Sequence, residues 1–169
     1  MFIFKIVLLI SIVVASSIIG ILFSKKYSKR EKELKDMKSA LNMFATKIKF
    51  TYEPIPNLFL EISNKIGGNI GKIFERASIR MREENAGEAW DNSFLDVPNN
   101  LLKEDITILK NLGRLLGQTD LEGQISEIEV VNDFLTSQLE NAKNEKLKNE
   151  KMYRTLGIIS GLTIAIILI

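Results

Sequence analysis

The chain has 169 residues, a formal net charge of +2, no cysteine and no histidine. The length suits one domain, and the small net charge does not indicate a nucleic-acid partner. Without cysteine the chain has no disulfide and no thiolate chemistry. Without histidine it lacks the commonest general base and the commonest ligand of transition metals. We therefore expect no cofactor and no bound metal.

Residues 2–23 form an apolar segment in which Lys5 is the only charged residue. As a helix that rises 1.5 Å per residue they would extend about 33 Å, enough to cross a hydrocarbon core of about 30 Å. A cleaved signal peptide with small residues at 15–17 is the alternative, but the strong basic cluster follows the apolar run. We predict an uncleaved transmembrane helix over residues 1–24.

The segment after the first apolar run is basic and contains one acid, Glu31. Its basic residues are Lys25, Lys26, Lys29, Arg30 and Lys32. Positive residues beside a membrane span stay on the cytosolic side. We therefore expect residues 25–154 to be cytosolic and the N-terminus to be outside.

The apolar residues in the middle of the chain have helical spacing. Apolar residues three or four positions apart lie on one face of a helix. In this segment they are Leu34, Met37, Leu41, Phe44 and Ile48. Prolines at 54 and 56 end this helix, glycines at 67 and 68 end the next, and residues 98–100 are expected to open a later one. We predict an all-α bundle of about six helices, with the first and last side by side. Trp90, the only tryptophan, is expected in its core.

Residues 155–169 carry no charged side chain. As a helix they extend about 22 Å, less than a hydrocarbon core of about 30 Å. Met152 and Tyr153 can lengthen this helix, while Lys151 and Arg154 reach back to the interface. We predict a second transmembrane helix over residues 155–169, which puts the C-terminus outside as well. A buried terminal helix of a soluble bundle is the alternative.

Residues at the junctions between the apolar ends and the polar middle are predicted to lie at the membrane interface. They are Lys25, Lys26, Lys29, Arg30, Lys151, Tyr153 and Arg154. Gly157 and Gly161 form a pair of small residues that could pack against another membrane helix, so a homo-oligomer is one reading of them.

Residues 115–124 have the composition of a turn between two helices. Gly117 suits the left-handed conformation that ends a helix, and Thr119 with Glu122 forms a capping box for the next. This pattern explains every residue of the turn except its two glutamines. We predict a partner-docking surface there, formed by Gln118, Asp120 and Gln124.

Several motifs, in order along the chain, resemble a known family. They are Tyr-Glu-Pro-Ile-Pro at 52–56, Glu-Ala-Trp at 88–90, Leu-Leu-Gly-Gln-Thr-Asp at 115–120, and Asn-Glu-Lys-Met-Tyr-Arg-Thr-Leu-Gly at 149–157. With the apolar ends and the basic stretch they are similar to stage III sporulation protein AB over essentially the whole chain. That family is similar to the cytoplasmic domains of the type II secretion platform protein F, which are helical bundles.

The resemblance implies a membrane-anchored, non-enzymatic platform in the channel between mother cell and forespore. The protein would lie in the mother-cell membrane around the forespore of an endospore-forming bacterium. Its partners would be other stage III sporulation channel proteins, notably a cytosolic secretion-type ATPase, and membrane lipids. The alternative function is a membrane-bound enzyme or small-molecule sensor that uses acidic residues. That alternative predicts a polar pocket and a carboxylate with a shifted pKa.

Overall fold

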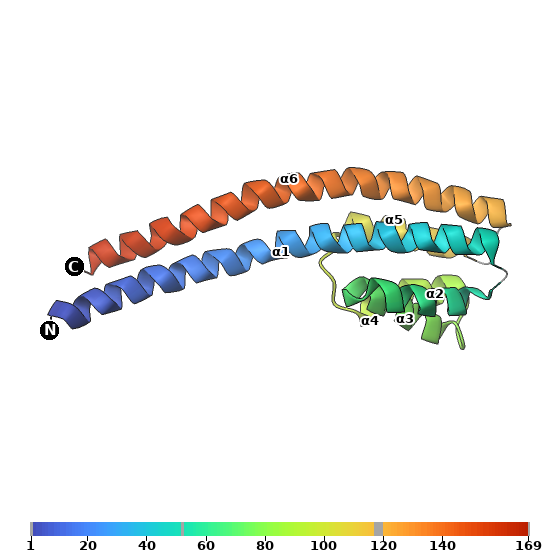
Figure 1. Ribbon diagram of the computed structural model, residues 1–169, viewed down its shortest axis with the longest axis horizontal. Coiled ribbons are helices and arrows are strands. Elements are labelled where there is room, and N and C mark those ends of the chain that lie inside the picture. Colours follow the sequence, from blue (N-terminus) through green and yellow to red (C-terminus); the bar gives the residue numbers. More distant parts are fainter. Residues whose placement is uncertain (1, 52, 117–119, 169) are drawn as a thin grey trace. The chain divides into compact units, whose positions relative to one another are not determined.

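The computed structural model describes residues 2–51, 53–116 and 120–168. The described residues form six α-helices (Figure 1): α1 Phe2–Phe50, α2 Ile55–Ile66, α3 Gly68–Arg80, α4 Ala86–Asp96, α5 Lys103–Leu115 and α6 Leu121–Ile167. The all-α prediction is confirmed. The first and last helices are each continuous from an apolar end of the chain into its polar middle.

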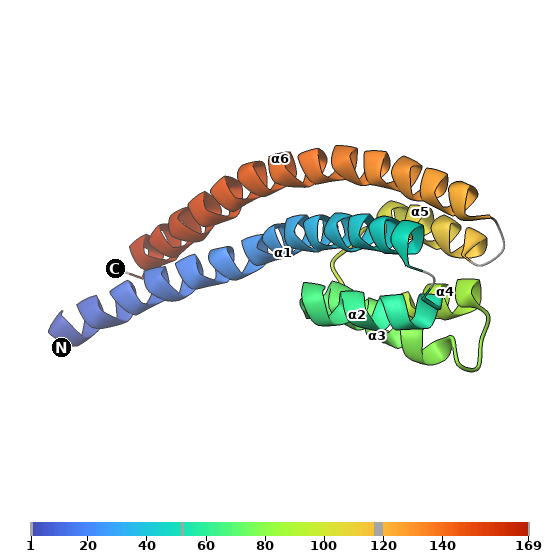
Figure 2. The ribbon, with the colours of Figure 1, turned by 45° about the vertical axis from the view of Figure 1, so that its right-hand side comes forward.

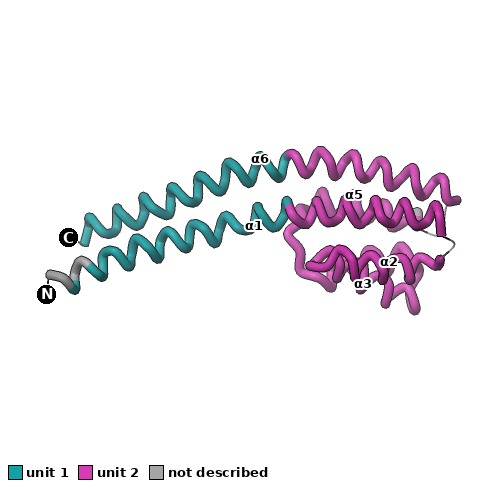
Figure 3. The backbone as a smooth tube through the Cα atoms, viewed as in Figure 1, with its two compact units in different colours: residues 1–31, 141–169 teal, residues 32–140 magenta. Residues whose placement is uncertain are grey.

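The chain divides into two compact units (Figure 3). Unit 1 contains residues 1–31 and 141–169, which include the apolar ends of α1 and α6. Unit 2 contains residues 32–140 and therefore α2 to α5 with the remaining parts of the two long helices. The predicted membrane spans, residues 1–24 and 155–169, fall within unit 1, and their bounds stay predictions.

The core of unit 2 is built on the apolar stripe predicted for α1. Leu34, Met37, Leu41 and Phe44 are fully buried, whereas Ile48 at the end of the stripe is half-buried. The neighbouring helix α6 runs beside α1 in both views (Figures 1 and 2). Polar side chains also join the two helices in this unit, since Asn132 Nδ2 donates to Asn42 Oδ1 at 2.8 Å.

Aromatic rings connect α1 to the shorter helices. Neighbouring ring centroids lie 4.9–5.5 Å apart through Phe44, Phe59, Phe74, Trp90 and Phe94. Most of these pairs meet edge to face, the arrangement that the charge distribution of aromatic rings favours. Trp90 is fully buried, and its Nε1 donates to the Leu109 carbonyl at 2.6 Å. The prediction that Trp90 belongs to the core is confirmed.

The helix boundaries follow the predicted breaks in most places. Pro54 lies between α1 and α2, and Pro56 falls in the first turn of α2. Gly67 ends α2 with a φ of 64°, a left-handed conformation that favours glycine. The prediction that residues 98–100 open a helix is wrong, because α5 begins at Lys103. Asn100 is instead held by the Glu33 carboxylate, and the Asp105 carboxylate caps α5 by accepting from the Leu102 amide at 2.8 Å.

Candidate functional site

The apolar ends of α1 and α6 pack against each other as an antiparallel pair in unit 1 (Figures 1 and 3). The Ser16 hydroxyl donates to the Gly157 carbonyl at 2.7 Å and lies 2.7 Å from the Ser160 hydroxyl. Further along, Phe23 and Tyr153 stack with ring centroids 6.1 Å apart. Residues 141 positions apart in the sequence thus meet, and the two apolar ends form one structural element.

Glycines allow this close approach between the two helices. A Cβ atom added to Gly20 would lie 2.5 Å from the Tyr153 carbonyl oxygen, and one added to Gly157 would lie 2.9 Å from the Ser16 carbonyl oxygen. A Cβ atom on Gly161 would lie 2.9 Å from the Val13 Cα. The small residues singled out for a homo-oligomer therefore contact α1 of the same chain.

The exposure pattern of this pair is the reverse of that in a water-soluble bundle. The apolar end of α6 buries Gly157, Gly161 and Ala165, which repeat every four residues, and exposes large aliphatic side chains such as Ile159 and Leu162. Helices in a membrane pack through small residues and turn large apolar side chains to lipid. In water the large side chains would occupy the helix interface instead.

Length and hydropathy distinguish the two ends. Among the described residues one helix is long and apolar enough to cross a membrane, the stretch of α1 from Val7, with a mean hydropathy of 2.6 in its most apolar 18 residues and 11% of them buried. The apolar end of α6 does not meet the same criterion. By length and composition, α1 is therefore the candidate membrane anchor.

The basic residues at the junctions fall into two groups. Lys25, Lys26, Lys29, Lys151 and Arg154 are exposed. Arg30, which the sequence also predicts at the membrane interface, is only 4% exposed and pairs with Glu145 at 3.0 Å. One step along, Lys146 pairs with Glu31 at 2.9 Å, and this carboxylate raises the pKa of Lys146. The cations beside the apolar ends are thus exposed, while Arg30 and Lys146 hold the two helices together.

A groove between α1 and α6 lies at the junction of the apolar and basic segments, and we call it the junction groove. It has a volume of about 600 Å³ and is lined by Ile21, Ser24, Leu147, Glu150, Lys151, Arg154 and Thr155. Its walls therefore combine apolar side chains, hydroxyl groups, two cations and one carboxylate. Both residues from α1 and all five from α6 belong to unit 1.

The predicted docking surface is described only in part, because Gln118 lies outside the described residues, as do Gly117 and Thr119. Helix α6 begins at Leu121, and the Asp120 carboxylate accepts from the Gly123 amide at 2.9 Å. Asp120 therefore occupies the capping position that we predicted for Thr119, because the helix starts one residue later than expected. Gln124 is half-buried and engaged within the chain. Docking at these residues stays a prediction.

Two carboxylates in unit 2 have shifted pKa values, and in both the shift favours the ionised form. Lys47 and Lys65 both bind Glu61, at 2.5 and 2.8 Å, and lower its pKa. Arg80 holds Asp96 through two hydrogen bonds of 2.8 and 3.0 Å and lowers its pKa likewise. A general acid would need the opposite shift, so these two carboxylates have the character of ion-pair partners.

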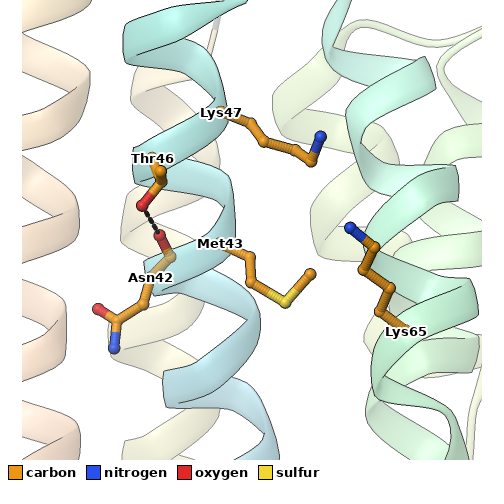
Figure 4. Close-up of a pocket in the computed structure, with 5 residues that line it drawn as sticks. All are labelled: Asn42, Met43, Thr46, Lys47 and Lys65. Carbon is orange, nitrogen blue, oxygen red and sulfur yellow. Dashed lines mark hydrogen bonds between the residues drawn. The ribbon is translucent and has the colours of Figure 1, made fainter.

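Pockets in unit 2 are lined in part by charged side chains. In the pocket of about 280 Å³ shown in Figure 4, the Lys47 and Lys65 side chains extend toward each other, and Met43 lies beside them. A second pocket, of about 500 Å³, is lined by Asn85, Gly87, Glu88, Asp91, Asn92 and Arg114. There Asp91 Oδ1 is buried without a hydrogen-bond partner among the described residues. No group of three metal-binding side chains occurs within the described ranges.

Glu33 is a buried polar centre that sequence analysis missed. It is 6% exposed and accepts hydrogen bonds from the Asn69 side-chain amide and from both the side-chain and main-chain amides of Asn100, at 2.5–2.8 Å. The carboxylate thus ties α1 to α3 and to the loop before α5. In the sequence, Glu33 is a charged residue beside the apolar Leu34. Its spacing does not distinguish a buried carboxylate from a solvent-exposed one.

Comparisons with known proteins agree on one family. The model of the family described as stage III sporulation protein AB matches residues 5–169. Stage III sporulation protein AB of Bacillus subtilis (strain 168) is 26% identical over 161 residues, which cover 93% of this chain and 94% of that protein. A solved structure of a stage III sporulation protein AB has a similar fold, with a TM-score of 0.65 and 19% identity over 71% of this chain and 98% of the solved one. The chain therefore belongs to the stage III sporulation protein AB family.

Proposed function

We propose that this protein is a membrane-anchored, non-enzymatic platform of the sporulation apparatus, held in the membrane by both apolar ends. The observation that carries the proposal is the pairing of these ends through small residues with their large apolar side chains turned outward. Membership of the stage III sporulation protein AB family supports the role in sporulation and a place in the mother-cell membrane around the forespore.

Energetics favour lipid around the pair. The exposed large apolar side chains between Phe4 and Phe23 and between Leu156 and Leu168 have exposed fractions of 41–77%. Removing a half-exposed aliphatic side chain from water gains roughly 1 kcal/mol. Summed over both ends, the gain exceeds the net stability of an ordinary domain, about 5–15 kcal/mol. The same argument applies to the C-terminal end, although its apolar length alone is short.

Charge supports a cytosolic middle. Lys25, Lys26 and Lys29 follow the first apolar end, and Lys148, Lys151 and Arg154 precede the second. Positive residues beside membrane spans remain in the cytosol. Both flanks therefore favour the same orientation, with residues 25–154 cytosolic and both termini outside.

The second span can be tested in this cysteine-free chain by placing a single cysteine at its end. With Leu168→Cys expressed in vegetative cells, we expect labelling by a membrane-impermeant maleimide added outside. Lys103→Cys, in the middle of the chain, serves as the matched internal position and should be labelled only after lysis. Labelling of Leu168→Cys only after lysis would contradict the second span, because the chain would then have a single membrane anchor.

The platform role rests on docking of a cytosolic secretion-type ATPase, for which Gln118, Asp120 and Gln124 remain the proposed surface. Asp120→Asn removes the charge and keeps a good capping residue, so it separates docking from helix stability. We expect Gln118→Ala combined with Asp120→Asn to reduce ATPase co-purification from sporulating cells, while the exposed control Ser126→Ala does not. Equal co-purification with both variants would exclude this surface.

A further inference from the structure

The junction groove contains cations that the protein itself leaves unpaired. Lys151 and Arg154 are exposed and have no ion-pair partner in the part of the chain that the structure describes. Further along the same two helices, Arg30 and Lys146 are both paired with acids. Lys151 and Arg154 are therefore available to an anion from outside the chain.

The remaining walls of the groove determine what can bind there. Ile21 and Leu147 are 46% and 69% exposed and provide apolar surface. The Ser24 hydroxyl donates to the Ile21 carbonyl at 2.8 Å, so its lone pairs remain available as acceptors. Glu150 is the one acid that lines the groove, and it can accept hydrogen bonds from hydroxyl groups.

We propose that the junction groove binds an anionic glycerophospholipid with a hydroxyl-bearing headgroup, of the phosphatidylglycerol type. Lys151 and Arg154 would hold its phosphate through charge-assisted hydrogen bonds. Glu150 would accept from the headgroup hydroxyls, and one acyl chain would lie along Ile21. This inference rests on the proposed insertion of both apolar ends, because the groove then lies at the level of the headgroups.

Lipid retention by the full chain tests the proposal. The protein is purified in a mild detergent and titrated with phosphatidylglycerol, phosphatidylethanolamine or inorganic phosphate, and bound molecules are counted by native mass spectrometry. We expect one phosphatidylglycerol per chain, about tenfold weaker retention of phosphatidylethanolamine, and no displacement by millimolar inorganic phosphate. Equal retention of both lipids, or displacement by free phosphate, would overturn the proposal.

Variants locate the binding. Lys151→Gln combined with Arg154→Gln should weaken phosphatidylglycerol retention by about tenfold or more, since each cation near an anionic lipid contributes about fivefold. Lys148→Gln removes a neighbouring exposed charge that does not line the groove, and it should retain the lipid. Thr155→Phe fills the groove and leaves every charge in place, so it should also lose the lipid. If Lys148→Gln loses as much lipid as the groove variants, binding is a property of net charge and the groove is not a site.

The same preparation separates this inference from the proposed function. A protein that resists extraction from membranes by alkaline carbonate but shows no preference for phosphatidylglycerol would refute the groove alone. Extraction of the protein from membranes by alkaline carbonate would refute the membrane anchoring and, with it, the lipid site.

Discussion

Gly157→Leu should separate the two apolar ends, because the site has no room for a side chain. A Cβ atom there would lie 2.9 Å from the Ser16 carbonyl oxygen and 3.4 Å from the Ser17 Cα, both backbone atoms of α1. Overpacking of a tight interface costs about 1–3 kcal/mol. At about 2 kcal/mol, the equilibrium between paired and separated helices would shift roughly thirtyfold.

Disulfide crosslinking between the helices measures this shift. Cysteines replace Ser16 and Ser160, whose hydroxyl oxygens are 2.7 Å apart, in the otherwise cysteine-free chain. The cost of about 2 kcal/mol comes from packing alone, because the variant with cysteine at 16 lacks the Ser16 hydrogen bond. We expect rapid crosslinking with glycine at 157, strongly reduced crosslinking in Gly157→Leu, and no change in the control Ile158→Leu, whose side chain is 41% exposed. Unchanged crosslinking in Gly157→Leu would refute the small-residue pairing.

Unit 2 gives three further predictions, each measured on the full chain in detergent. Trp90→Ala should lower the free energy of unfolding of unit 2 by about 3–5 kcal/mol in denaturant titrations, because the substitution leaves a cavity in the aromatic core. An unchanged free energy of unfolding would contradict the role of Trp90 in this core. Glu33→Ala should cost about 1–3 kcal/mol because it leaves buried amide donors unpaired, and Glu33→Gln should cost less; equal losses would exclude that cause. Arg80 lowers the pKa of Asp96 below 3.8, the ordinary pKa of this carboxyl group. Their pairing therefore stabilises the fold above pH 3.8, and this stabilisation disappears as the pH falls through the lower pKa of the folded state. The melting temperature of Asp96→Asn should therefore lie below that of the wild type at neutral pH and match it in acid, and an unchanged difference in acid would refute the assignment.

The helices of unit 2 could be predicted because local rules determine them. The stripe from Leu34 to Phe44 has helical period, and proline and glycine mark the ends of α1 and α2. Where a distant residue intervenes, local rules fail. The loop before α5 is longer than predicted because Glu33, far away in the sequence, binds Asn100.

The pairing of the apolar ends was only partly visible in the sequence. Gly157 and Gly161 indicate a close helix contact, but a pair of small residues does not say which helix is the partner. Ser16 and Gly20 on α1, spaced four residues apart, are the complementary signal that the prediction did not use. The division of the junction cations into paired and unpaired groups depends on the register between α1 and α6, which no single-chain pattern gives.

We propose that the chain enters the membrane at both ends and keeps its middle in the cytosol. Single cysteines at Lys103, Asn111 and Leu168, all at exposed positions, test it most directly in intact vegetative cells with a membrane-impermeant maleimide. We expect labelling from outside at 168 alone, and labelling at 103 and 111 only after lysis. Labelling of 103 or 111 in intact cells would contradict it.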